Sequence, residues 1–202
     1  MEIATIGGRR TLFVMATEHE YGPQLRARCR PLVTGVGPIE AAIGTTACLA
    51  ACAAAGGLPE RIVSLGSAGS RRCTLGQVYQ VESVSWRDMD ASALGFERGV
   101  TPFCDHPARI SLPTPLPNVP VATLSTGADI VSGARYDAIH ADLVDMETFA
   151  VVRAASRFAV PVIGLRGVSD GPDAIAGLSD WTALLGVLDA RLAQAVDALS
   201  RV

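Results

Sequence analysis

The distribution of apolar residues along the chain predicts an alternation of strands and helices. Residues 11–16, 61–65 and 160–165 are short, almost continuous apolar runs, which are typical of strands that are covered on both faces. Polar and apolar residues alternate at 77–84, and this period of two indicates a further strand. Weaker strand signals lie at 31–34, 119–125 and 143–144.

Longer segments between these runs have helical character. They are 18–28, 38–55, 146–158 and 180–201, with a shorter segment around Arg135. The last long segment carries apolar residues at a regular spacing, which predicts one buried helix face: Leu184, Leu188, Leu192 and Val196. Because strands and helices alternate, we expect an α/β protein with a largely parallel sheet.

Length and composition limit the domain organisation. A chain of 202 residues is long enough for one ordinary domain and too short for two, so we expect a single domain over 1–202. Apolar residues make up 49% of the chain and aromatic residues only 5%, which predicts a core built from Ala, Val, Leu and Ile. The Pro-rich stretch 88–120 is expected to form loops over this body.

The charged residues exclude one class of function. Lys and Arg number 17 against 20 Asp and Glu, for a net charge of −3 without a long run of either sign. A nucleic-acid binder normally has a basic face or arm. We therefore expect no nucleic-acid partner.

The sequence predicts no membrane segment and a cytoplasmic location. Residues 41–59 are uncharged, but they hold too few large aliphatic side chains for a spanning helix, so we expect a buried or interface helix. The first residues lack the features of a signal peptide. Five cysteines without a CxxC pair indicate reduced thiols, as is usual in the cytoplasm.

Several motifs that carry chemistry are incomplete. Gly35-Val36-Gly37 lies between a predicted strand and a predicted helix, as in dinucleotide-binding proteins, but Glu40 occupies the third glycine position. We interpret this segment as a tight turn whose amides cap the helix. Ser67 lacks the G-x-S-x-G context of a nucleophilic serine, and no two histidines have metal-ligand spacing. Neither a serine nucleophile nor a bound metal is expected.

Carboxylates follow three of the predicted strands. They come directly or shortly after the strand ends: Glu18, Glu20, Asp145, Glu147 and Asp170. In an open α/β sheet, ligands bind beyond the carboxyl ends of the strands, where we also expect a glycine-rich turn at 66–69. Each acid alone fits the first turn of a helix equally well, so it is their expected convergence that indicates a site.

The segments that contain these acids resemble the purine nucleoside phosphorylase/nucleosidase superfamily, and within it the methylthioadenosine/S-adenosylhomocysteine nucleosidases. The matching segments lie in order along nearly the whole chain: Ala16-Thr17-Glu18-His19-Glu20, Gly35-Val36-Gly37-Pro38, Leu65-Gly66-Ser67-Ala68-Gly69, Arg87-Asp88-Met89-Asp90, Val144-Asp145-Met146-Glu147 and Arg166-Gly167-Val168-Ser169-Asp170. The resemblance implies a nucleoside phosphorylase-like fold of three layers, in which helices flank a mostly parallel or mixed central sheet.

The resemblance also implies hydrolysis of a purine N-glycosidic bond without a cofactor or metal. It assigns the activation of water to Glu20, the protonation of the leaving base to Asp170, and the binding of ribose hydroxyls to Glu147. An oxocarbenium-like ribose develops in such a cleavage, and two carboxylates acting as base and acid suit it. Further substrate contacts are implied for Val36, Ser67, Ala68, Gly69, Ile130, Val131, Asp145, Met146 and Ser169.

Two alternatives to a hydrolase stay open. Related bacterial phosphorylases have an arginine where this chain has Ser64, and phosphate favours Arg or Lys as a ligand, so water is the expected nucleophile. Arg71 and Arg72 follow the glycine turn and leave a phosphorylase open, and the other alternative is a nucleoside-binding module that has lost catalysis. The apolar Ala-rich helix and the resemblance predict a homodimer that acts on a small-molecule nucleoside.

The chain departs from the nucleosidase pattern around the substrate. Ile130 stands where an aromatic residue would stack on the purine, and Leu94 stands where an aromatic residue would lie beside the 5′ substituent. The chain is also shorter than usual between 99 and 119. The sequence therefore does not define the base or the 5′ substituent.

Overall fold

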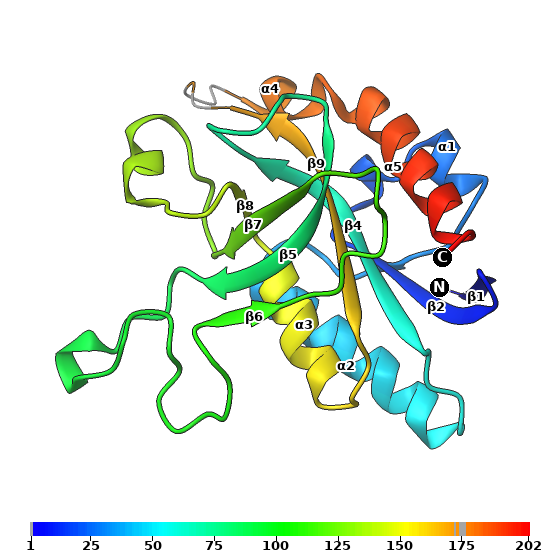
Figure 1. Ribbon diagram of the computed structural model, residues 1–202, viewed down its shortest axis with the longest axis horizontal. Helices are drawn as coiled ribbons and strands as arrows, with labels where there is room; N and C mark the ends of the chain where they lie inside the picture. Colours follow the sequence, from blue (N-terminus) through cyan, green and yellow to red (C-terminus); the bar gives the residue numbers. More distant parts are fainter. Residues whose placement is uncertain (1, 172, 174–176) are drawn as a thin grey trace.

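The computed structural model describes residues 2–171, 173 and 177–202, and a mixed β-sheet forms its centre (Figure 1). Nine strands make up the sheet within these residues: β1(Ile3–Ile6), β2(Arg9–Met15), β3(Leu32–Val33), β4(Arg61–Gly69), β5(Val78–Trp86), β6(Arg109–Ser111), β7(Val121–Thr126), β8(Leu143–Asp145) and β9(Val162–Asp170). Parallel pairs join β2 to β3 and β4, β4 to β9, β5 to β7, and β7 to β8. The other pairs are antiparallel.

The sheet folds back on itself around its middle strands. β9 lies between β4 and β5, β5 continues to β7 and β8, and β8 returns to β4 through the pair Gly69–Val144. These five strands therefore form a closed circuit of pairings. Because β4 and β9 are parallel, their carboxyl ends at Gly69 and Asp170 lie side by side. This is the edge at which ligands bind in α/β sheets.

Helices cover both faces of the sheet, which confirms the predicted α/β class with a mixed sheet. α2(Pro38–Ala54) and α3(Thr148–Ser156) pack together on one face, and α1(Pro23–Arg26) and α5(Leu185–Leu199) pack together on the other (Figure 1). The shorter helices are α4(Leu178–Thr182) and the 3₁₀ helices η1(Glu18–Glu20), η2(Ser92–Leu94) and η3(Gly133–Ala138). Each face has its own, mainly aliphatic core.

The C-terminal apolar stripe faces the sheet, as the sequence predicts. Leu188, Leu192 and Val196 are buried under α5, and Leu184 packs at the edge of the same cluster. Each buried side chain of this size stabilises the fold by about 1.5–3 kcal/mol. Gly167 in β9 makes room for the helix, because a Cβ there would lie 2.6 Å from the Leu188 side chain.

The turn predicted at 66–69 is wrong. These residues are the last part of β4, where they continue the ladder with β9. β9 is also longer than its apolar run and ends at Asp170. Glycine stands here because side chains approach the backbone closely: a Cβ at Gly69 would lie 2.6 Å from Oδ2 of Asp170. In the sequence, glycines that are required by such a close approach look the same as the glycines of a turn.

Three helix predictions are wrong in extent. The segment 18–28 forms only η1 and α1, because the extended Gly22 separates them and Pro23 begins α1. The helix predicted from Met146 begins at Thr148, since Asp145 ends β8 and accepts the Thr148 amide at 3.0 Å. The C-terminal segment is divided into α4 and α5 and begins at 178 instead of 180.

The segment between β5 and β7 contains η2 and β6. Its last part lies over the body as predicted, with Leu116 buried in the core, whereas its first part extends away from the body (Figure 1). Leu94 and Phe103 are exposed on it. Apolar side chains on a projecting segment are available for contact with another surface.

Two observations bear on the membrane and cysteine predictions. No helix within the described ranges has both the length and the apolar character needed to cross a bilayer. The uncharged stretch 41–59 consists mainly of α2, which packs on α3 and β3. All five cysteines are free thiols, and Cys48 is buried in the core on α2.

Asp189 in α5 acts as a helix cap for α1. Gly22, which precedes α1, has no side chain for capping. The buried carboxylate of Asp189 accepts the amides of Gln24 at 2.8 Å and Leu25 at 2.9 Å instead. A Cβ at Gly22 would lie 2.5 Å from this carboxylate, so the glycine allows the cap to approach.

We expect Asp189→Ala to lower the free energy of unfolding by about 2–4 kcal/mol, because two amides at a helix N-terminus lose their acceptor. Urea unfolding followed by circular dichroism measures the loss. Asp197→Ala is the control, since its ion pair with Arg28 is partly exposed and is expected to contribute less than about 1 kcal/mol. Equal losses in the two variants would contradict the capping role.

Candidate active site

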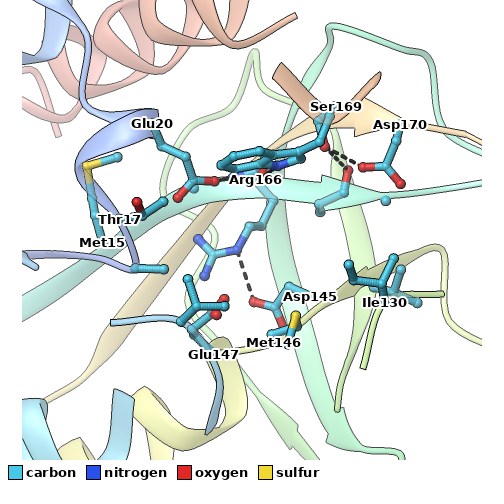
Figure 2. Close-up of a pocket in the computed structure, with 18 of the residues that line it drawn as sticks. Met15, Thr17, Glu20, Ile130, Asp145, Met146, Glu147, Arg166, Ser169 and Asp170 are labelled. Carbon is cyan, nitrogen blue, oxygen red and sulfur yellow. Dashed lines mark hydrogen bonds and ion pairs between the residues drawn. The ribbon is translucent and has the colours of Figure 1, made fainter. Parts of the chain in front are cut away.

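A cavity of about 580 Å³ lies at the carboxyl edge of the sheet. The ends of β2, β4, β8 and β9 form it, together with the turn before α2, the segment 129–131 and part of α4 (Figure 2). A cavity of this volume holds a small metabolite, and such sites combine apolar walls with a few polar groups.

All twelve residues that the sequence analysis selected line this cavity. They come from six separate segments of the chain: Glu20, Val36, Ser67, Ala68, Gly69, Ile130, Val131, Asp145, Met146, Glu147, Ser169 and Asp170. Figure 2 shows its acidic side chains arranged around the buried Arg166. The residues are therefore neighbours in space, and the individual roles assigned to them stay predictions.

η1 follows β2 directly and places Glu20 in the cavity. The Thr17 side chain accepts the His19 amide and so caps η1. Glu20 is buried, and its Oε1 accepts the Ser67 amide at 2.7 Å. The backbone thus holds one carboxylate oxygen and fixes the direction of the side chain.

Arg166 provides the positive charge of the site. Its Nε donates to Asp145 at 3.1 Å, and its terminal nitrogens donate to the carbonyl oxygens of Ser64 and Leu165 and to the hydroxyls of Ser64 and Thr148. All five N–H groups of the guanidinium therefore have acceptors. Across the described ranges, no group of three or more His, Cys, Asp and Glu side chains is arranged to hold a metal ion.

The carboxylate of Asp145 is occupied by protein groups. Besides Arg166, it accepts hydrogen bonds from the hydroxyl of Thr126 at 2.6 Å and from the amide and hydroxyl of Thr148. The side chains of Arg166 and Asp145 are only 3% and 1% exposed. A buried ion pair is favourable only when its remaining donors and acceptors are bonded as well, and this condition is met here.

Glu147 connects the end of β8 with the turn before α2. Its Oε1 accepts the Gly37 amide at 2.8 Å. Gly35 and Gly37 both have φ of +98°, which glycine adopts without strain. The tight turn is as predicted, but its Gly37 amide binds a carboxylate instead of capping α2. Burial raises the pKa of Glu147 to about 7, the Asp145 charge adds to this, and the Gly37 amide and Arg166 oppose it.

Asp170 ends β9 and lies on the opposite side of the site from Glu20 in Figure 2. Ser169 donates to its Oδ1 at 2.5 Å. Burial raises the pKa of Asp170, and the Ser169 hydroxyl opposes the effect. A carboxyl group with a raised pKa keeps its proton closer to neutral pH, as a general acid must.

Two further residues that the sequence analysis did not select line the cavity. Trp181 in α4 lines it, and its indole N–H donates to the Ser67 hydroxyl at 2.9 Å. Arg87 lines it too, and its terminal nitrogens donate to the carbonyl oxygens of Ser125, Asp145 and Asp129. Arg87 belongs to a segment that resembles the nucleosidases, so this resemblance could have identified it as a site residue. No periodicity or motif marks Trp181.

Four residues considered in the sequence analysis lie elsewhere. Glu18 is exposed and pairs with Arg26 at 2.7 Å. Leu94 is 75% exposed on η2, outside the cavity lining. Arg71 and Arg72 lie outside it as well, where they bond to groups in and just after η3. The acids at the strand ends therefore do not all converge, since Glu18 faces solvent.

Comparison with known proteins identifies the family of the chain. Residues 27–201 match the family model of the phosphorylase superfamily. The 5′-methylthioadenosine/S-adenosylhomocysteine nucleosidase of Actinobacillus succinogenes is 29% identical over 168 residues, which cover 73% of this chain and 70% of that protein. The nucleosidase of the same name from Haemophilus influenzae strain PittEE is 28% identical over 166 residues, with the same coverage.

Solved structures have the same fold. The 5′-methylthioadenosine/S-adenosylhomocysteine nucleosidase from Neisseria meningitidis, in complex with methylthio-immucillin-A, has a TM-score of 0.78 at 18% identity and covers 95% of this chain and 99% of its own. Futalosine hydrolase of Helicobacter pylori strain 26695 has a TM-score of 0.78 at 18% identity, with coverages of 95% and 97%. These similarities confirm the nucleoside phosphorylase-like fold.

Glu147 makes the stability of the fold depend on pH. Its pKa is about 7 in the folded chain, against 4.5 for an ordinary glutamate, so the folded chain binds this proton more tightly. The unfavourable contribution of its ionisation is absent below about pH 4.5, grows as the pH rises towards 7, and is complete above that.

Glu147→Gln keeps an acceptor for the Gly37 amide and removes the ionisation. We expect this variant to exceed the wild type in free energy of unfolding by about 1–3 kcal/mol at pH 8 and by less at pH 5, as measured by urea unfolding. Glu18→Gln is the control, since its acid is exposed and should give no gain that grows with pH. A difference for Glu147→Gln that is equal at both pH values would refute the raised pKa.

Proposed function

This chain belongs to the phosphorylase superfamily, and we propose that it hydrolyses the N-glycosidic bond of a purine nucleoside to a free base and a ribose derivative. The observation that carries the proposal is the convergence of Glu20, Glu147 and Asp170 on one cavity from distant parts of the chain. The curated relatives are nucleosidases by name, which supports the same reaction. Water is the second substrate, and the reaction requires no cofactor.

The three acids divide the reaction between them. Asp170 donates its proton to N7 of the base while the C–N bond breaks and its electron pair leaves with the base. Glu20 orients a water molecule and accepts its proton, and the water oxygen bonds to the anomeric carbon. Glu147 accepts hydrogen bonds from the ribose hydroxyls. Glycosidases divide the work between two carboxylates in the same manner.

Acid and base catalysis supply only part of the acceleration. Each contributes about 10²–10⁴-fold, or roughly 3–5 kcal/mol at 1.36 kcal/mol per factor of ten. The remainder must come from positioning and from the field of the site. The carboxylates around the cavity suit a ribose that becomes positively charged, and Arg166 directly neutralises only Asp145 among them.

Water is favoured over phosphate as the nucleophile because the donors of Arg166, the buried cation at the centre of the site, are already bonded. A phosphate dianion needs Arg or Lys donors, and the chain has no lysine. The five N–H groups of Arg166 are all engaged with protein acceptors. Arg71 and Arg72, which left the phosphorylase alternative open, bond to groups outside the cavity.

We propose a nucleoside with an apolar 5′ substituent, of the methylthioadenosine or S-adenosylhomocysteine type. Val36, Ile130, Leu178 and Trp181 give the cavity apolar walls. Trp181 supplies an aromatic surface in a site where Ile130 replaces the aromatic residue expected for purine stacking. The substrates in the names of the curated relatives are of this type.

We also propose that the chain is a cytoplasmic homodimer. Ile39 and Ile43 are exposed one turn apart near the start of α2, with Ile39 at 70%, and Val36 is exposed just before this helix. Exposed apolar side chains that gather on a surface indicate an interface. The projecting segment after β5 offers Leu94 and Phe103 as further apolar contacts. Free thiols at all five cysteines agree with a reducing compartment.

The reaction is tested by measuring free base released from methylthioadenosine, inosine and futalosine, with and without phosphate. We expect release without phosphate and no increase when phosphate is added. Strict dependence on phosphate would establish a phosphorylase instead. Binding without release, measured by calorimetry, would establish a module without catalysis.

The proposed roles are tested in the same assay with Glu20→Gln and Asp170→Asn. Each should lower kcat by about 10²–10⁴-fold without changing the far-ultraviolet circular dichroism spectrum. The wild type should lose activity on the alkaline side as Asp170 ionises, and Asp170→Asn should not show this limb. Glu18→Gln is the matched control, because Glu18 is also in η1 but faces solvent. Wild-type rates in both acid variants would exclude the mechanism.

The dimer is tested by sedimentation velocity. Ile43→Glu places a charge beside the exposed Ile39 of α2 and should convert the dimer to a monomer, because an unpaired charge cannot be buried at low cost. Val187→Glu changes an exposed apolar residue on α5 and should leave the dimer intact. A wild-type chain that sediments as a monomer at micromolar concentration would disprove the proposal.

A further inference from the structure

Tyr136 is a buried tyrosine whose hydroxyl lies near Gly69 of the cavity lining. It belongs to η3, is 2% exposed, and packs in a small apolar cluster with Val131 and Val144. Its hydroxyl has no hydrogen-bond partner among the residues that the structure describes. Buried tyrosine hydroxyls usually have a partner, because an unpaired buried polar group is unfavourable. The burial of this hydroxyl without a partner therefore needs an explanation.

Gly69 brings this hydroxyl close to Asp170. A Cβ at Gly69 would lie 2.4 Å from the Tyr136 hydroxyl oxygen and 2.6 Å from Oδ2 of Asp170. The distance between these two oxygens is therefore no greater than the sum of the two values. The register between β4 and β9 shifts between Ala68 and Gly69, which sets Gly69 opposite Asp170. Bulges of this kind redirect side chains beside active sites. Only glycine leaves room for both oxygens here.

η3 and the residues after it are bonded to the chain that follows β4. Arg71 forms an ion pair with Asp137 at 2.6 Å, and Ser70 and Arg72 donate to carbonyl oxygens just after η3. The two arginines considered above as phosphate ligands thus hold the helix that carries Tyr136. The Tyr136 ring itself is held by its packing against Val131 and Val144.

We propose that Tyr136 is a positioning residue for Asp170, and that its hydroxyl donates to Oδ2 while this oxygen gives its proton to the base. The inference rests on the proposed function, in which Asp170 is the acid. Ser169 donates to Oδ1 at 2.5 Å, so Tyr136 provides the second oxygen with a donor of its own. The proton passes from Oδ2 to the base nitrogen, Tyr136 stays neutral, and its hydrogen bond strengthens as the carboxylate becomes charged.

The charges around the hydroxyl agree with a donor role. Burial and the Asp170 charge both raise the pKa of Tyr136, and Arg87 is the charged group that opposes them, so the phenol keeps its proton. Burial raises the pKa of Asp170 and the Ser169 hydroxyl lowers it. The acids Glu20 and Glu147 line the same cavity. A donor to the charged form of Asp170 lowers its pKa, so loss of the Tyr136 hydroxyl should raise it.

The test is Tyr136→Phe, which removes the hydroxyl and keeps the ring. We expect kcat for methylthioadenosine to fall by about 10–100-fold with a change in KM of less than about twofold. The alkaline limb of kcat/KM should move to higher pH by about one unit. Tyr79→Phe is the matched control, because Tyr79 is a partly buried tyrosine on β5 whose hydroxyl accepts the Thr74 amide, and its pH profile should be that of the wild type.

A second substrate distinguishes a role of Tyr136 in positioning Asp170 from a role in packing alone. The leaving group of a p-nitrophenyl riboside needs no protonation. The Tyr136→Phe variant should therefore cleave this substrate at the wild-type rate. A partly unfolded variant would lose both activities equally and would not give this result. An unchanged alkaline limb, or equal losses with both substrates, would overturn the positioning role. A wild type that cleaves neither substrate would refute the proposed function, and this inference with it.

Discussion

The buried ion pair between Arg166 and Asp145 is the interaction on which the site depends. Carboxylates from several segments meet in one cavity, and their mutual repulsion would oppose folding without a cation among them. Arg166 supplies this charge, and its bonds to Asp145, Ser64 and Thr148 join β9, β8, β4 and α3. Removal of one partner from such a pair costs about 3–5 kcal/mol. The pair therefore holds the strand ends from which the proposed catalytic groups project.

Around this pair, the fold gives each acid a different environment. Ser67 binds Glu20 through a backbone amide, and Gly37 does the same for Glu147. Asp170 faces a hydroxyl donor at one oxygen and the glycine backbone near the other. A hydrolase of this kind needs a protonated and an ionised carboxyl group at the same pH. Burial and hydrogen bonding supply that difference, since the acids are chemically almost identical.

Much of the fold could be predicted because hydrophobic periodicity is a local property. The buried strands, the α2 helix and the apolar stripe of α5 all follow from residues that are close in sequence. The acids at the strand ends could be predicted as well, since parallel strands deliver their carboxyl ends to one edge. The predictions were wrong at 66–69 and 18–28, where the backbone depends on distant partners: β9 continues the ladder of β4, and Asp189 caps α1.

The sequence by itself determined the class of fold, the carboxylates that follow its strands and the resemblance to nucleosidases. Only the tertiary structure decided that the donors of Arg166 are all bonded, that Trp181 forms a wall of the cavity, and that Tyr136 lies against Gly69 beside Asp170. The physical reason is distance along the chain. Arg166 and Ser64 are 102 positions apart, and a contact of that range leaves no periodicity or spacing from which it could be inferred.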